Sequence, residues 1–102
     1  KNTIFAYGGI GVIIHKHCII GDYCMVGSNV TIGGRSRRVN VPVIEDNVII
    51  CTGAKVLGDI HVGAGSVIGA NAVVIHDVPA KVVVAGMPAK VIKTNINYQD
   101  YL

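Results

Sequence analysis

The chain has 102 residues, of which 51% are apolar and 15% are charged, and its formal net charge is +3. This length accommodates one domain or a part of one. The small charge excludes the broad basic face of a nucleic-acid-binding protein, and no apolar run approaches the twenty residues of a membrane span. Three cysteines without CxxC spacing, and no recognisable signal peptide, predict a reducing, cytoplasmic location.

The apolar residues are mainly branched aliphatics, since tryptophan is absent and phenylalanine occurs once. Such a composition predicts a narrow, layered core in which similar small shapes stack. So many branched aliphatic residues on so short a chain also predict an exposed apolar face. We therefore expect an oligomer rather than a monomer.

A sixfold repeat follows an irregular first coil, which we expect at residues 1–13. From Ile14 onward, an aliphatic residue occupies every sixth position in two runs that share one register. The runs consist of Ile14, Ile20, Val26 and Ile32, and of Ile44, Ile50, Val56, Val62, Ile68 and Val74. This period matches neither a helix nor a long strand. It predicts an all-β solenoid over residues 14–85, in which each repeat is a short strand plus a corner with one bulky and one small inward side chain.

The two runs are separated by a segment that breaks the pattern, at residues 33–43. Arg38 occupies the position of an inward aliphatic residue, and burying an unpaired arginine would be very costly. We therefore predict that the segment loops out of the wall and returns in phase at Ile44. Arg35, Arg37 and Arg38 gather in this loop and are candidates for binding a phosphate or a carboxylate of the substrate.

If three hexads form one triangular coil, equivalent corners recur every eighteen residues. This spacing predicts one column of corners containing His17, Arg35, Gly53 and Asn71, and beside it a column containing Lys16, Gly34, Thr52 and Ala70. It also predicts that the loop leaves the wall directly above the corner at residues 15–17.

The C-terminal part, residues 86–102, is predicted to differ from the repeats. A turn at Pro79 precedes a last strand at residues 81–85 and a tight loop at residues 86–90. Residues 91–102 are polar enough for a short helix or a frayed end.

Several segments resemble a known family. They are VTIGG at residues 30–34, TGAKVLG at 52–58, VGAGS at 62–66 and GMPAK at 86–90. The pattern resembles the left-handed parallel β-helix acyltransferases with bacterial hexapeptide repeats. It is most similar to the C-terminal half of serine acetyltransferases, and related sugar O-acetyltransferases share it. The resemblance implies a left-handed triangular prism with one extruded loop and a short C-terminal tail.

The resemblance also implies an activity, which is acetyl-CoA-dependent transfer of an acetyl group. The acceptor would be a hydroxyl or amine of a sugar, a polysaccharide precursor or a small metabolite such as serine. The family works as a homotrimer, with acetyl-CoA in the groove between neighbouring prisms. The implied cofactor-binding residues here are the small corners and the terminal turn, namely Gly34, Thr52, Gly53, Ala70, Asn71, Pro88, Ala89 and Lys90.

The chain departs from the family at two places. Serine acetyltransferases carry Asp-His just before the segment that begins here at Gly11, where this chain has Tyr7-Gly8. Their loop carries Asp-Arg-His-Pro, where this chain has VNVP at residues 39–42. These departures argue against serine as the acceptor.

Acetyl transfer to a hydroxyl needs a general base, which is typically a histidine. His15 and His17 flank a lysine on the corner beneath the loop and are the catalytic candidates, with His17 ahead because it falls in the column. The alternative is that these histidines have no catalytic role and only make a surface corner soluble. His61 and His76 fall at outward positions and are expected to be solvated. A backbone N–H of the turn at residues 33–34 is the candidate oxyanion donor.

Two other functions remain open from the residues alone. One is a non-catalytic trimeric β-helix module that binds or assembles without transferring acetyl. The other is a metal site formed by His15 and His17 across subunits. Because no third ligand is evident, no metal is expected.

Overall fold

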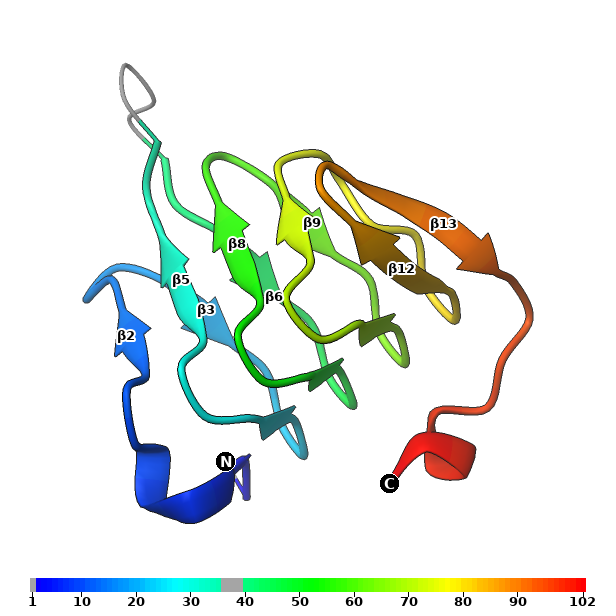
Figure 1. The fold of residues 1–102 in the computed structure, drawn as a ribbon, viewed down its shortest axis with the longest axis horizontal. Helices are drawn as coiled ribbons and strands as arrows, with labels where there is room; N and C mark the ends of the chain where they lie inside the picture. The colour runs from blue at the N-terminus through cyan, green and yellow to red at the C-terminus, as the bar shows by residue number, and fades with distance from the viewer. Residues whose placement is uncertain (1, 36–39) are drawn as a thin grey trace.

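The computed structural model describes residues 2–35 and 40–102, and it forms a parallel β-helix of three sheets (Figure 1). Arg37 and Arg38 lie outside the described residues. Sheet A consists of β1 (Ile4–Phe5), β4 (Met25–Val26), β7 (Ile49–Ile50), β10 (Val67–Ile68), β12 (Val83–Gly86) and β13 (Ala89–Lys93). Sheet B consists of β2 (Ile13–Ile14), β5 (Thr31–Gly33), β8 (Lys55–Leu57) and β11 (Val73–Val74). Sheet C consists of β3 (Ile19–Ile20), β6 (Val43–Ile44) and β9 (His61–Val62).

The chain visits the sheets in the order A, B, C, so the prism has three edges. We call the corners between sheets A and B the AB edge; they lie at residues 10–11, 28–29, 52–53 and 70–71. The corners between sheets B and C form the BC edge, at residues 15–18, 34–35 with 40–42, 58–60 and 75–77. Successive coils stack along the long axis, from the blue N-terminal end to the orange β13 in Figure 1.

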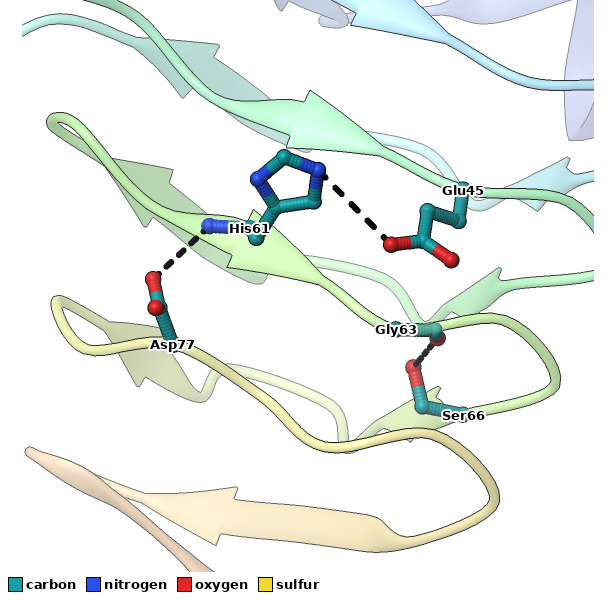
Figure 2. A network of polar contacts seen from close by, with 5 residues as sticks. All are labelled: Glu45, His61, Gly63, Ser66 and Asp77. Carbon is teal, nitrogen blue, oxygen red and sulfur yellow. Dashed lines mark hydrogen bonds and ion pairs between the residues drawn. The ribbon is translucent and has the colours of Figure 1, made fainter.

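The sixfold register points into the prism, as predicted. From Val26 to Val74, each aliphatic residue of the register is 2% exposed or less. Ile14 and Ile20 are half-buried because they line the first coil, at the open end of the prism. The small residues four positions later are also buried from Cys24 onward, and Ser66 donates a hydrogen bond from Oγ to the Gly63 carbonyl at 2.7 Å (Figure 2).

The three cysteines are free thiols that contribute to packing. Cys24 is buried and belongs to the core inside the prism, which Cys18 contacts from the half-buried first coil. Cys51 packs against the outer cluster on sheet A. Burial raises the pKa of each of the three thiols, which keeps them protonated near neutral pH.

The register across the loop corrects the predicted columns. Ile13 pairs with Thr31 and Lys55 pairs with Val73, 18 residues apart in each case. Thr31, however, pairs with Lys55, a separation of 24. The extruded loop therefore enlarges a single corner of the BC edge by six residues and does not add a wall to the prism. As a result, His17 and Arg35 do not share a column with Gly53 and Asn71.

Both ends of the chain add structure outside the regular repeats. Within residues 1–13, β1 pairs with β4, and a 3-10 helix, η1 (Ala6–Gly9), leads to the AB edge. At the other end, β12 and β13 form an antiparallel hairpin. The sequence predicted the turn of this hairpin but not β13. Residues 86–90 were expected to form a loop and residues 91–102 a helix or a frayed end, whereas β13 begins within that loop and continues as far as Lys93.

The C-terminal tail covers the outer face of sheet A. Ile96 and Tyr98 pack against Ile49, Val67 and Val83, which are 5%, 3% and 7% exposed. The chain then ends in a 3-10 helix, η2 (Tyr98–Tyr101). Among the described residues, none of the helices has the length and apolar character needed to cross a membrane.

Candidate functional site

The sequence-predicted catalytic histidines line a cavity on the BC edge. His15 and His17 lie on the corner between β2 and β3, next to the base of the loop, because β2 pairs with β5 and β3 pairs with β6. The cavity has a volume of about 470 Å³, and we call it the loop-side cavity. It is lined by His15, His17, Asn40, Val41, Val43, Asp59, Ile60 and His61. The predicted position of the loop, above the histidine corner, is therefore confirmed.

Polar contacts order several side chains of the loop-side cavity. The His17 backbone N–H donates to His15 Nδ1 at 3.1 Å, and the two imidazole rings lie 5.4 Å apart between centroids. Asn40 Nδ2 donates to Asp59 Oδ2 at 3.2 Å, which ties the returning limb of the loop to the next coil. The cavity thus presents imidazoles on one coil and a carboxylate held by an amide on another.

His61 is the cavity residue that the sequence reasoning missed. It is exposed, as its outward position predicted, but it also lines the cavity, and its Nε2 lies 3.7 Å from Glu45 Oε2 (Figure 2). The spacing of these residues in the sequence could have predicted the contact between Glu45 and His61. With an eighteen-residue coil, Val43 and His61 pair across adjacent strands, so Glu45 is a diagonal neighbour of His61 on the same face.

Arg35 lines a second cavity on the other side of the loop. This cavity has a volume of about 350 Å³ and shares Asp59 and Ile60 with the loop-side cavity. The Arg35 stem packs over Gly58, where an added Cβ would lie 3.0 Å from Arg35 Cδ. Glycine at this position therefore leaves room for the arginine, whose charge sits beside Asp59, His76 and Asp77 in the cavity lining.

The predicted cofactor-binding residues, with the exception of Gly34, gather at the AB edge. Thr52 and Gly53 lie directly below Ala70 and Asn71, because β8 pairs with β11 and the Asn71 N–H donates to the Thr52 carbonyl at 2.9 Å. The β12–β13 turn continues this edge. It carries Pro88, Ala89 and Lys90, and β12 pairs with β10. Gly34 lies on the BC edge with Arg35.

The corners of the AB edge offer polar backbone groups as well as small side chains. The N–H groups of Gly53 and Asn71 already donate to the coil below, to Ser28 and Thr52. In the described part of the chain, the N–H groups of Thr52 and Ala70 have no hydrogen-bond acceptor. Lys55 Nζ donates to the Gly53 carbonyl at 2.7 Å, so a positive charge also lies at this edge.

The sequence resemblance aligns Tyr7-Gly8 with the Asp-His of serine acetyltransferases. Both residues adopt left-handed backbone angles within η1, with φ of 54° and 68°. Tyr7 is 80% exposed, and nothing described lies within 4 Å of where a Cβ on Gly8 would be. This position leads into the AB edge, so it is separated from the histidines of the BC edge by the width of sheet B.

Comparisons with known proteins agree with this architecture. Residues 42–76 match the family model described as bacterial transferase hexapeptide (six repeats). The serine acetyltransferase of Bacillus subtilis (strain 168) is 45% identical over 101 residues, which cover 90% of this chain and 46% of that protein. The serine acetyltransferase of Synechococcus elongatus is 43% identical over 91 residues, covering 87% and 37%. The chain thus spans less than half the length of these curated relatives.

Solved structures show the same fold. The serine acetyltransferase from Brucella abortus strain S19 in complex with coenzyme A has a TM-score of 0.88 at 33% identity, covering 95% of this chain and 40% of that one. Soybean serine acetyltransferase complexed with serine has a TM-score of 0.85 at 34% identity, covering 90% and 38%. The chain therefore carries bacterial hexapeptide transferase repeats and has the left-handed parallel β-helix fold, and over nearly its whole length it is similar to part of the serine acetyltransferases.

Proposed function

We propose that this protein transfers an acetyl group from acetyl-CoA to the hydroxyl of a small acceptor, in the cytoplasm and as a homotrimer. The observation that carries the proposal is the gathering of seven predicted cofactor-binding residues along the AB edge and its terminal turn, in a chain 45% identical to a serine acetyltransferase. A similar solved structure is a complex with coenzyme A, which supports the same cosubstrate here.

The AB edge suits the pantetheine arm of acetyl-CoA. Thr52, Gly53, Ala70 and Asn71 have short side chains, so an extended chain can pass close to the backbone. The unbonded N–H groups of Thr52 and Ala70 would donate to the amide carbonyls of the arm. At the terminal turn, Pro88 and Ala89 would contact the adenine end, and Lys90 would neutralise a phosphate as a point charge.

A trimer would complete the site. Within one copy, the cofactor residues lie on the AB edge and the histidines on the BC edge, on opposite sides of sheet B. A neighbouring copy would bring its BC edge, including Gly34, to the cosubstrate. Exposed apolar residues beside these edges support such an interface, since Ile10, Ile13 and Ile19 are 66%, 65% and 61% exposed.

The loop-side cavity would hold the acceptor hydroxyl. His17 and His15 would take part in proton transfer or donate hydrogen bonds to the acceptor, and the backbone N–H of the turn at residues 33–34 would stabilise the oxyanion. Arg35, with Arg37 and Arg38 of the same loop, would bind an anionic group of the acceptor or of the cosubstrate. No metal is needed for the proposed transfer, because histidine side chains would move the proton and a backbone N–H would stabilise the oxyanion.

Serine is the first acceptor to test. The departures at Tyr7-Gly8 and in the loop argued against it, but the relatives and solved structures named above are serine acetyltransferases. Amino and neutral sugars form the comparison panel, since the resemblance extends to sugar acetyltransferases.

The deciding experiment is a thiol-release assay with acetyl-CoA and this panel. We expect the wild-type protein to release CoA with at least one acceptor, and His17→Gln to reduce the rate by about tenfold or more. If the wild type binds CoA but releases none with any acceptor, the enzymatic function is wrong.

That outcome would favour the alternative, a non-catalytic trimeric binding module. The observation in its favour is the replacement of the family's Asp-His by Tyr7-Gly8. The alternative predicts measurable CoA binding, trimeric mass and no acetyl transfer.

A further inference from the structure

The loop-side cavity contains a third imidazole that neither the family pattern nor the sequence reasoning assigned, that of His61. His61 starts β9, and its side chain points outward from sheet C, where it is 59% exposed. Figure 2 shows its Nε2 directed at Glu45, whose Oε2 lies 3.7 Å away. His61 lines the proposed acceptor cavity, and the Glu45 carboxylate lies behind it, outside the cavity lining.

The backbone holds this pair in position from both sides. The His61 N–H donates to Asp77 Oδ1 at 2.9 Å, and the Val78 N–H donates to the His61 carbonyl at 2.9 Å. The Glu45 N–H donates to the Val62 carbonyl at 3.0 Å. Glu45 and His61 therefore project from adjacent, hydrogen-bonded coils rather than from a loop, which fixes the relative position of their backbones.

The other two imidazoles of the cavity are less suited to accept a proton. His15 Nδ1 already accepts from the His17 backbone N–H, so the neutral His15 ring carries its proton on Nε2 and acts as a donor. His17 contacts the His15 ring, and in the described part of the chain it has no carboxylate at ion-pair distance. Of the three described imidazoles in this cavity, His61 is the one that has a carboxylate at ion-pair distance and a second ring nitrogen left for the acceptor.

We infer that His61 is the general base of the loop-side cavity and that Glu45 is its positioning residue; this rests on the proposed acetyl transfer. With Nε2–H toward Glu45, His61 Nδ1 takes the proton from the acceptor hydroxyl as its oxygen attacks the thioester carbonyl. The new carbon–oxygen bond forms and the carbon–sulfur bond breaks. The imidazolium, stabilised by the Glu45 carboxylate, then returns the proton to the leaving sulfur and yields the CoA thiol.

The test compares steady-state kinetics of the full chain for His61→Gln, Glu45→Gln and a distant control, Asp100→Asn, on the exposed helix η2. We expect His61→Gln to lower kcat by roughly 100-fold or more, with the KM for acetyl-CoA unchanged within about twofold. Glu45→Gln should lower kcat by about fivefold, as expected for an exposed ion pair, again without a change in KM. Asp100→Asn should match the wild type.

Chemical rescue separates a role in proton transfer from a structural role. His61→Ala should regain a measurable part of kcat when free imidazole is added, and Asp100→Asn should not respond to it. Wild-type activity in His61→Gln, or a loss that imidazole does not restore, overturns the role of His61 and leaves the acetyl transfer standing. The absence of thiol release by the wild type with every acceptor overturns the proposed function and this role together.

Discussion

At the scale of single residues, the AB edge depends on corners that only certain side chains tolerate. Gly11, Asn29, Gly53 and Asn71 follow one another along this edge, and all four have φ between 58° and 75°. Glycine and asparagine are the residues that adopt this left-handed conformation at least cost. They also alternate for a steric reason, because the amide oxygens of Asn29 and Asn71 occupy the space of a Cβ on Gly11 and Gly53.

We predict that Gly53→Ala destabilises the protein by roughly 1–3 kcal/mol. The alanine would have to adopt a φ of +75°, and its Cβ would lie 3.1 Å from Asn71 Cγ. Urea unfolding followed by circular dichroism measures the change. Gly33→Ala is the matched control, since nothing lies within 4 Å of its Cβ and its φ is not positive. Equal stability of the two variants would contradict the steric argument.

At the scale of elements, sheet A differs from sheets B and C because the chain covers its outer face. In a parallel β-helix, the outward residues of each wall face solvent or another copy. On sheet A, Ile49, Val67 and Val83 are instead buried under Ile96 and Tyr98 of the tail. The Ile96 N–H also donates to the Lys81 carbonyl at 3.1 Å, which anchors the tail to the last coil. The tail thus leaves sheets B and C as the faces open to other copies.

Removing the Tyr98 ring of the tail should expose the outer face of sheet A. We predict that Tyr98→Ala lowers the free energy of unfolding by roughly 1–3 kcal/mol, because its ring packs against the outer cluster of sheet A. Tyr101→Ala lies in the same short helix but outside that cluster, so it should change stability by less than about 0.5 kcal/mol. Thermal unfolding of both variants compares them. A larger effect at Tyr101 would show that the tail is held by another contact.

At the scale of the whole molecule, the extruded loop determines how the functional residues are distributed. Because it enlarges one corner of the BC edge, the histidines stay on that edge while the small corners continue undisturbed along the AB edge. The proposed site therefore needs two copies, one for each edge.

Mixing two inactive variants tests this arrangement. Ala70→Trp should block the cosubstrate at the AB edge, and the double variant His17→Gln, His61→Gln should disable the BC edge. Unfolded together and refolded as a one-to-one mixture, they should recover about one quarter of wild-type activity, since one neighbouring pair in four combines two intact edges. Each variant refolded alone should stay inactive. Sedimentation equilibrium provides the mass of the assembly, and a trimer without recovery would mean that each copy holds a complete site.

The sequence by itself determined the wall of this protein and the place of its interruption. A residue such as Ile50 must face inward because its neighbours repeat every six positions, and Arg38 cannot follow that register without burying its charge. These are local constraints, so they are readable along the chain. The same reasoning located the small corners at Thr52 and Ala70 and the histidines beside the loop.

Only the tertiary structure decided which of these corners share an edge. The sixfold phase is unchanged whether the interrupted segment adds a wall or enlarges a corner, so the sequence could not separate His17 from the column of Gly53. Strand pairing resolves this, because hydrogen bonds between coils fix Thr31 opposite Lys55. The same pairing brings Glu45 to His61, and the packing of Tyr98 on sheet A likewise depends on contacts between distant segments.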